Sequence, residues 1–330
     1  MTHYSLPLRP RRLRKTATIR NMVQENWLRT EQFIAPLFIS ETLSEKRAIP
    51  SMPGLFQLTL NDLDKEIEEI SALGLPAVLL FGIPAHKDST GSSSLSDSGI
   101  IQQAIQKIRS INKDIVIIAD VCFCEYTDHG HCGVMEGETL INDATLELLT
   151  SQAISYAKAG ADWIAPSSNT DGMVGAIRDG LDNAGYEDVA ILSYAVKYSS
   201  SFYGPFRQAA EGAPRYGNRK TYQMNPANGH EALREAALDI EEGADLLMVK
   251  PAMNYLDVIY RLKQNFPEVP CCAYQVSGEF SMIKAAAAQG LINEEEAMME
   301  SLLAIKRAGA DLIISYFAKD VAKLLKISAP

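Results

Sequence analysis

The sequence predicts an α/β fold of the (β/α)8 TIM-barrel type with an N-terminal extension arm, and three observations support this. Eight short apolar runs rich in β-branched residues alternate with longer segments of helical periodicity. Such continuous apolar strands indicate burial on both faces, which is typical of parallel sheets covered by helices. A junction recurs between helix and strand, as Ala-Gly-Ala-Asp at 159–162 and 308–311 and as Glu-Gly-Ala-Asp at 242–245. Repeated βα units with one junction favour a closed barrel.

The expected strands and helices follow one another in regular order. The strands span 33–39, 77–81, 115–120, 161–165, 190–194, 244–250, 271–275 and 310–315. Helical patterns lie at 61–73, 99–110, 143–158, 228–241, 279–288 and 293–307. The glycine of each junction suits the left-handed position just after a helix. An open doubly wound sheet is the main alternative, but its dinucleotide-binding version is weakened because no Gly-x-Gly-x-x-Gly follows the first strands.

Composition limits the class of protein. The 330 residues carry 41 acidic and 31 basic side chains, for a formal net charge of −10. Such a chain repels nucleic acid, and it has no apolar run of about 18 residues that could span a membrane. The start lacks an apolar signal region, so we expect a cytoplasmic protein with one barrel domain at 33–330. Residues 1–32 are expected to be an arm that contacts other subunits. The arm contains a basic run, made of Arg9, Arg11, Arg12, Arg14 and Lys15. This run is a solvated tail, a contact with acidic groups of a neighbouring subunit, or a tail that binds nucleic acid.

Two lysines stand at or just after expected strands, where the chemistry of a barrel is located. Lys250 continues the apolar run 246–249, and Lys197 follows the strand at 190–194. Burial and a second cation nearby both lower the pKa of a lysine, which frees its amine to attack carbonyl compounds. The alternative is that both side chains extend into solvent. The same rim is expected to carry Asp120, which ends the strand at 115–120, and Ser277 and Tyr316, which follow the strands at 271–275 and 310–315.

Three cysteines, Cys122, Cys124 and Cys132, fall within eleven residues, with His129 and His131 between them. Three thiolates suit Zn²⁺, and three protein ligands leave a fourth position open for water or substrate. His131 is either a fourth ligand or a hydrogen-bond partner outside the ligand set. Buried unligated thiols or a redox pair are the alternatives to a metal site.

The polar segment 207–223 contains glycine and proline and shows no strong periodicity. A long loop after a barrel strand is often a lid over the site. Its basic side chains suit carboxylate binding, unless the loop is simply solvated: Arg207, Arg215, Arg219 and Lys220. Together these features predict imine chemistry on a carboxylated keto or amino-keto substrate, assisted by a Lewis acid.

The string DVCFCEYTDHGHCG at 120–133 resembles the zinc site of the porphobilinogen synthase (5-aminolaevulinate dehydratase) family. The segments FYGPFR at 202–207, MVKP at 248–251 and VSGE at 276–279 are similar to the same family, as are 9–14 and 49–54. The resemblance spans nearly the whole chain. It implies a (β/α)8 barrel that assembles as a homo-octamer, with an N-terminal arm wrapping a neighbour. It also implies the condensation of two 5-aminolaevulinate molecules into porphobilinogen, a precursor of haem and chlorophyll.

The resemblance assigns roles to individual residues. Lys250 forms the Schiff base with the substrate that becomes the propionate side, Lys197 serves the acetate-side substrate, and Asp120 is the acid–base candidate. Ser277 and Tyr316 match residues that hold the first carboxylate. Those that match the second carboxylate site are Arg207, Arg219 and Gln223. Because all three cysteines are kept, the chain resembles the zinc-dependent type, with zinc on Cys122, Cys124 and Cys132.

A second metal and one departure complete the resemblance. Many bacterial members have a Mg²⁺ site built on a glutamate that Glu235 matches, although a solvated helix glutamate is the alternative. After the fourth strand the family pattern is PSDMMDGRV, whereas residues 166–174 are PSSNTDGMV. Ser168 replaces an acid and Met173 replaces a base, so a paired interaction is expected to have been lost as a unit. Two other functions stay open: another lysine-dependent barrel enzyme such as an aldolase, and a non-catalytic zinc-binding or assembly protein.

Overall fold

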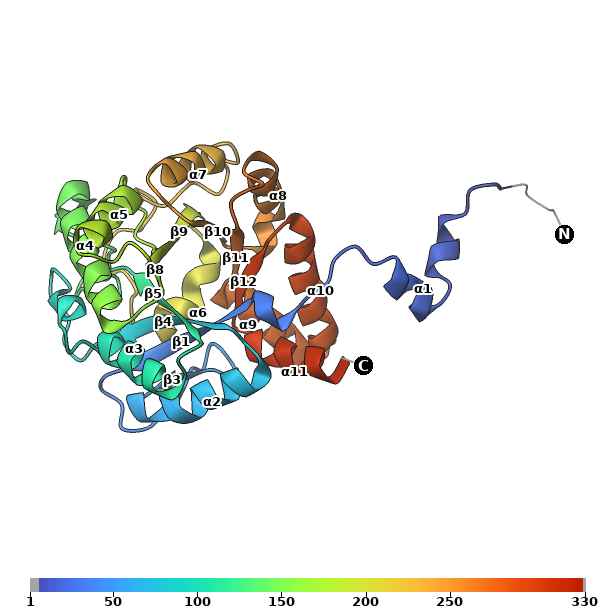
Figure 1. The fold of residues 1–330 in the computed structure, drawn as a ribbon, viewed down its shortest axis with the longest axis horizontal. Coiled ribbons are helices and arrows are strands. Elements are labelled where there is room, and N and C mark those ends of the chain that lie inside the picture. The colour runs from blue at the N-terminus through green and yellow to red at the C-terminus, as the bar shows by residue number, and fades with distance from the viewer. Residues whose placement is uncertain (1–5, 329–330) are drawn as a thin grey trace.

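The computed structural model describes residues 6–328, and eight parallel strands form a closed barrel at its centre (Figure 1). Pairing of the last strand with the first closes the barrel. The strands are β1 (Phe33–Ser40), β4 (Ala77–Ile83), β5 (Val116–Val121), β8 (Trp163–Pro166), β9 (Ala190–Lys197), β10 (Leu246–Lys250), β11 (Cys271–Gln275) and β12 (Leu312–Ser315). All eight expected strands are confirmed, and the open-sheet alternative is excluded.

Helices surround the barrel and cover its outer face. They are α2 (Leu63–Leu73), α3 (Ile100–Ile111), α4 (Asn142–Ala159), α5 (Met173–Asn183), α7 (Glu231–Glu241), α8 (Leu256–Asn265), α9 (Ser277–Ala288), α10 (Glu294–Ala308) and α11 (Ala318–Ser328). The sequence patterns missed α5, α8 and α11. In α5 the cause is glycine, which disfavours helix in isolation. Gly180 is needed for packing, because a Cβ there would lie 2.2 Å from a side-chain carbon of Thr150.

Shorter strands and helices lie in the loops between these elements. The strands β2 (Arg47–Ala48) and β3 (Phe56–Leu58) extend the sheet beside β1, and β6 (Met135–Glu136) pairs with β7 (Thr139–Leu140). The short helix α6 (Gly204–Ala209) follows the 3-10 turn η5 (Ser201–Tyr203) at the barrel mouth. None of the helices in residues 6–328 has the length and apolar character that crossing a bilayer requires.

The three recurring junctions have a common structural role. Their glycines have φ of 106°, 102° and 120°, as the left-handed position after a helix requires. Each following aspartate accepts a hydrogen bond from a backbone N–H at the start of the preceding barrel strand. The pairs are Asp162 with Ile117 (2.7 Å), Asp245 with Ile191 (2.7 Å) and Asp311 with Cys271 (2.9 Å). The expected strand starts at 161, 244 and 310 were therefore wrong, because these aspartates stand before the strands and join neighbouring ones.

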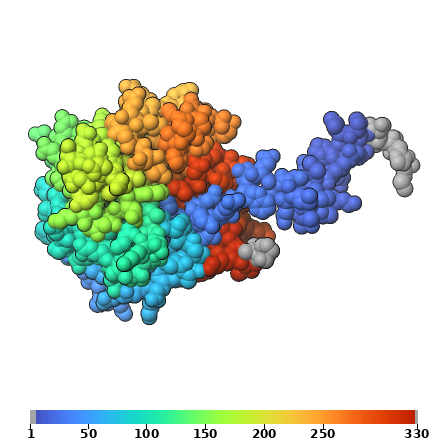
Figure 2. All heavy atoms as spheres, in the orientation of Figure 1, coloured from blue at the N-terminus to red at the C-terminus, as the bar shows by residue number. Residues whose placement is uncertain are grey.

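The described part of the arm extends away from the barrel (Figures 1 and 2). It contains the 3-10 turn η1 (Pro10–Arg14) and the helix α1 (Ala17–Met22). The basic run of the arm is exposed, and so are Leu13, Met22 and Trp27, which are 56%, 79% and 50% exposed. Apolar side chains left in solvent along such a segment are typical of a surface that another chain covers.

Replacing Asp245 by alanine should destabilise the barrel without changing its chemistry. The change leaves the buried N–H of Ile191 without its acceptor, which costs about 1–3 kcal/mol in unfolding free energy. Urea unfolding measures this loss. The control is Asp179→Ala on the exposed face of α5, which should change stability by less than about 0.5 kcal/mol. Equal effects of the two substitutions would contradict a structural role for the junction.

Candidate active site

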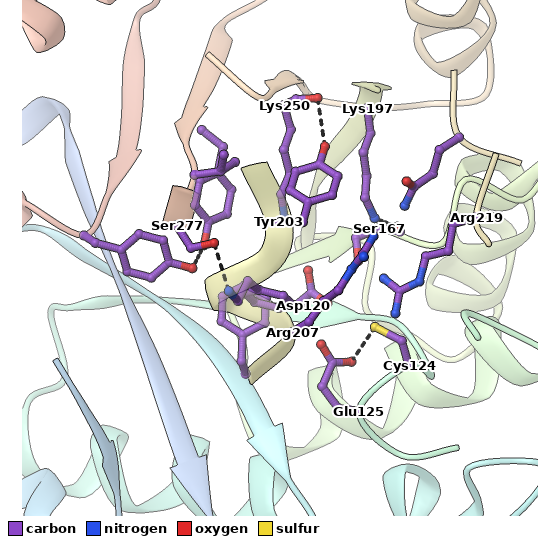
Figure 3. A pocket seen from close by; sticks show the side chains of 16 residues that line it. Asp120, Cys124, Glu125, Ser167, Lys197, Tyr203, Arg207, Arg219, Lys250 and Ser277 are labelled. Carbon is purple, nitrogen blue, oxygen red and sulfur yellow. Dashed lines mark hydrogen bonds between the residues drawn. The ribbon is translucent and has the colours of Figure 1, made fainter. Parts of the chain in front are cut away.

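Two buried lysines stand side by side at the carboxyl ends of neighbouring strands. Lys250 on β10 pairs in register with Lys197 on β9, and both side chains point into one cavity (Figure 3). The exposed fractions of Lys250 and Lys197 are only 6% and 5%, so the solvent-exposed alternative is wrong. Burial, and next the charge of Lys197, lower the pKa of Lys250 to about 7. A substantial fraction of Lys250 is therefore a neutral, nucleophilic amine near neutral pH.

A bulge in β9 determines which side chains accompany these lysines. The register passes from Leu247–Ser193 to Val249–Val196, so two steps along β10 correspond to three along β9. Side chains on regular strands alternate between faces, and a bulge re-aims them. As a result Tyr194, three residues before Lys197, lies under the lysine amines instead of facing away. Sequence reasoning missed Tyr194 because the expected strand ended there.

Asp120 lies on β5 and points towards the lysines (Figure 3). Its Oδ2 accepts a hydrogen bond from Ser167 Oγ at 3.0 Å, whereas its buried Oδ1 has no hydrogen-bond partner. The backbone carbonyl of Ser167 in turn accepts a hydrogen bond from Lys197 Nζ. Burial, and next the charge of Glu125, raise the pKa of Asp120 to about 7. The carboxyl group can therefore give or take a proton near neutral pH.

The three cysteines converge directly after β5. Their sulfur atoms all lie within 4.8 Å of one another, and all three residues are buried and free of disulfides. Hydrogen bonds from the Cys122 and Cys124 thiols hold the pKa of Cys132 well below its usual value. Three soft sulfur donors that meet at one point fit Zn²⁺, and three of them leave a position for an oxygen ligand.

His131 connects the cysteine loop to the lid. Its Nε2 lies 3.0 Å from the carbonyl oxygen of Tyr216, and its Nδ1 lies 3.1 Å from the hydroxyl of Tyr222. Both ring nitrogens are thereby occupied, so His131 is a hydrogen-bond partner outside the sulfur set. Tyr222 packs against the three cysteines. Tyr222 could not be selected from the sequence, because only the fold brings the lid onto this loop.

The lid brings hydrogen-bond donors to the cavity. Arg207, Arg219 and Gln223 all line it, and each has a buried side-chain nitrogen without a hydrogen-bond partner: Arg207 Nε, Arg219 Nε and Gln223 Nε2. Arg219 is held in place, because its Nη2 donates to the carbonyls of Gly130 at 2.9 Å and Gly212 at 2.6 Å. Unpartnered buried donors are costly, so such a group is expected to meet an anionic ligand.

Ser277 and Tyr316 also line the cavity. Ser277 Oγ accepts a hydrogen bond from the backbone N–H of Phe206 at 2.9 Å. The hydroxyls of Tyr316 and Tyr274 lie 3.0 Å apart. Of the residues that the sequence suggested, nine therefore border one cavity: Asp120, Cys124, Lys197, Arg207, Arg219, Gln223, Lys250, Ser277 and Tyr316. The space between its walls is about 460 Å³, including the part open to solvent.

Comparison with known proteins places this site in a family. Residues 7–324 match the model of the delta-aminolevulinic acid dehydratase family. The chain is 56% identical to the delta-aminolevulinic acid dehydratase of Halalkalibacterium halodurans and 52% identical to that of Bacillus subtilis. These matches cover 96% of this chain and 96% and 98% of the relatives. This chain belongs to the delta-aminolevulinic acid dehydratase family.

A solved structure agrees with this assignment. The delta-aminolevulinic acid dehydratase (porphobilinogen synthase) of Toxoplasma gondii, in complex with the reaction product porphobilinogen, matches with a TM-score of 0.94 at 42% identity. The match covers 97% of this chain and 92% of that one. The family resemblance of the sequence motifs and the (β/α)8 barrel are thus confirmed, and the chain is an enzyme of the dehydratase family.

Glu235, which matches the family's magnesium glutamate, lies apart from the lysines and cysteines. It stands on α7 beside a second, polar hollow that Asp171, Asp239 and Glu242 also line. Burial, and next the charge of Asp171, raise the pKa of Glu235. The two hollows share only one lining residue, Gln223.

The departure from the dehydratase pattern after β8 is accommodated locally. Ser168 Oγ lies 2.7 Å from Thr170 Oγ1 and 3.5 Å from Met173 Sδ. Ser168 is completely buried and Met173 is 4% exposed. The two positions at which the sequence departs from the resemblance pattern are therefore in contact here, through uncharged side chains.

Restoring the two charges tests this contact. Ser168→Asp alone should destabilise the protein by about 3–5 kcal/mol, because it buries a carboxylate without a partner. Ser168→Asp combined with Met173→Arg should recover most of that loss. Urea unfolding of the two single variants and the double variant gives the coupling energy. A double variant as unstable as the sum of the single effects would show that the two positions do not pair.

Proposed function

We propose that this enzyme condenses two molecules of 5-aminolaevulinate into porphobilinogen, with the release of two water molecules. The observation that carries the proposal is the pair of buried lysines in register within one cavity. Two ketone substrates need two amines to activate them as imines. Lys250, with its lowered pKa, forms the Schiff base with the propionate-side substrate, and Lys197 serves the acetate-side substrate.

The remaining walls distinguish two identical substrates. Ser277 and Tyr316 hold the carboxylate of the first molecule on one side of the cavity. The second carboxylate meets the unpartnered donors of the lid, namely Arg207 Nε, Arg219 Nε and Gln223 Nε2. Separate carboxylate sites hold the two molecules in different orientations. Because the enzyme holds both substrates in one cavity, their reaction no longer depends on a bimolecular collision. This effect lowers the activation free energy by up to about 7–11 kcal/mol.

Asp120 moves protons between the two substrates. Its carboxyl group lies beside both lysines and is held by Ser167, and its pKa of about 7 suits exchange in both directions. Cys122, Cys124 and Cys132 hold Zn²⁺, as their convergence within 4.8 Å allows. An ion held there would supply a Lewis acid for an oxygen of the second substrate or its water.

Assembly and a second ion belong to the same proposal. The arm at 1–32, which exposes apolar side chains in its described part from residue 6 on, contacts a neighbouring subunit in a homo-octamer in the cytoplasm. Glu235 would be a ligand of Mg²⁺ in its acidic hollow, a type of site that uses few protein ligands. Because this hollow is separate from the cavity that holds the lysines, an ion there would act on the reaction indirectly, as an allosteric effector.

Product assays test the proposed reaction. Porphobilinogen should form from 5-aminolaevulinate. The rate of its formation should fall at least about a hundredfold when zinc is chelated or when Cys124 is replaced by alanine. Adding zinc back to the chelated enzyme should restore the rate. Lys250→Ala should abolish turnover, whereas Lys107→Ala, which removes a half-buried lysine of α3 that pairs with Asp64 away from the cavity, should not affect it. Zinc-independent turnover of a carbonyl substrate would favour an aldolase-like enzyme. Zinc binding without any substrate imine would favour a non-catalytic protein.

The pH dependence of imine formation tests the state of Lys250. Trapping of the imine by cyanoborohydride should increase as the pH rises through about 7, because only the neutral amine attacks the ketone. The increase should not occur near 10.5, the ordinary pKa of a lysine. Lys197→Met removes a repelling cation, so protonated Lys250 becomes more stable and the midpoint should move to higher pH. Mass spectrometry of the reduced adduct measures both midpoints. An unchanged midpoint in the variant would exclude a contribution from the charge of Lys197.

A further inference from the structure

Four aromatic rings surround the amine of Lys250. Its Nζ lies 4.4 Å from the ring centroid of Tyr274, 4.8 Å from Tyr194, 5.2 Å from Phe206 and 5.6 Å from Tyr203. We call these four residues the aromatic cage. They come from four different elements, β11, β9, α6 and η5, so only the folded barrel brings them together.

The neighbouring lysine has a different environment. Lys197 Nζ lies over one ring of the cage, that of Tyr194 at 5.5 Å, and donates a hydrogen bond to the carbonyl of Ser167. Within residues 6–328 no hydrogen bond from Lys250 Nζ to an acceptor is found. A protonated amine has three N–H donors, and Lys250 Nζ, which borders the cavity, is surrounded by ring faces and not by protein acceptors. An iminium has a single N–H and a delocalised charge, so ring faces suit it better than they suit an ammonium group.

We propose that the aromatic cage stabilises the cationic imine of Lys250, with Phe206 as a catalytic residue. This rests on the proposed function. The amine adds to the ketone carbon, and a proton passes from nitrogen to the former carbonyl oxygen. The carbon–oxygen bond then breaks, the oxygen leaves as water with one further proton taken up from solvent, and the nitrogen keeps one hydrogen and the positive charge. The negative ring faces attract this charge as it develops.

Phe206 is the member of the cage that can be tested most cleanly. Its ring has no hydroxyl, unlike those of Tyr194, Tyr203 and Tyr274, so its electron density can be changed without altering a hydrogen bond. Its ring contacts Phe81 edge-on, with centroids 5.0 Å apart and an angle of 77°. It also lies 5.7 Å from Phe38, which is buried in the barrel core and is not among the rings over Lys250 Nζ.

Stepwise fluorination of Phe206 separates ring electrostatics from packing. Phenylalanine with one, two or three ring fluorines is incorporated at this position, and laevulinate, which lacks the amino group of the substrate, serves as the probe. The rate of imine formation at Lys250, measured by borohydride trapping, should fall with each fluorine, by about tenfold in total. Phe206→Leu should be at least as slow as the trifluorinated form. The same fluorinated series at Phe38 should show no trend.

The outcomes distinguish this inference from the proposed function. A flat series at Phe206, with the Lys250 imine still trapped, would overturn the role of the cage and leave the proposed function intact. An equal trend at Phe38 would also overturn it, because the effect would then come from packing. Absence of any trapped imine in the unmodified enzyme would instead reject the proposed function.

Discussion

Two amines share one buried cavity because the strands that carry them are neighbours in register. The pairing of Lys197 with Lys250 places two potential cations where water cannot separate their charges. The groups nearest to the two amines are arranged around this constraint. Asp120 supplies a carboxyl group beside the pair, and the carbonyl of Ser167 supplies an acceptor for Lys197. Burial lowers the pKa of Lys250 to about 7, so that a substantial fraction of this amine is neutral near pH 7. If β9 and β10 were not neighbours in the sheet, or if their register shifted by one residue, the two amines would be separated and the chemistry would be lost.

The cysteine loop and the lid form one structural unit. Arg219 donates to the carbonyl of Gly130, and His131 contacts both Tyr222 and the lid backbone. Gly130 has φ of 71°, and a Cβ there would lie 2.3 Å from the carbonyl oxygen of Ala213. Glycine is required at this point because the two segments approach so closely. The position of the sulfur donors therefore depends on the same contacts that hold the carboxylate-binding donors over the cavity.

One end of the barrel contributes to stability and the other end carries the chemistry, as is usual for this fold. Aspartates before β8, β10 and β12 tie neighbouring strands together at one end, while the reactive side chains lie at the other. The loop after β8 lies at the reactive end and packs through uncharged groups. There Ser168 and Met173 form a buried uncharged contact, and Ser167 beside them keeps its bonds to Asp120 and Lys197.

The sequence by itself determined the fold class, the strand order along the chain and the residues at the rim. These follow from short-range patterns: apolar runs, glycines after helices, and reactive side chains directly after strands. It could not reveal the bulge that turns Tyr194 towards Lys250, because register depends on the partner strand. Nor could it decide between the two roles of His131, or assemble the aromatic cage with Phe206 from a separate helix. Tertiary structure decided these points, because they depend on contacts between segments far apart in the chain.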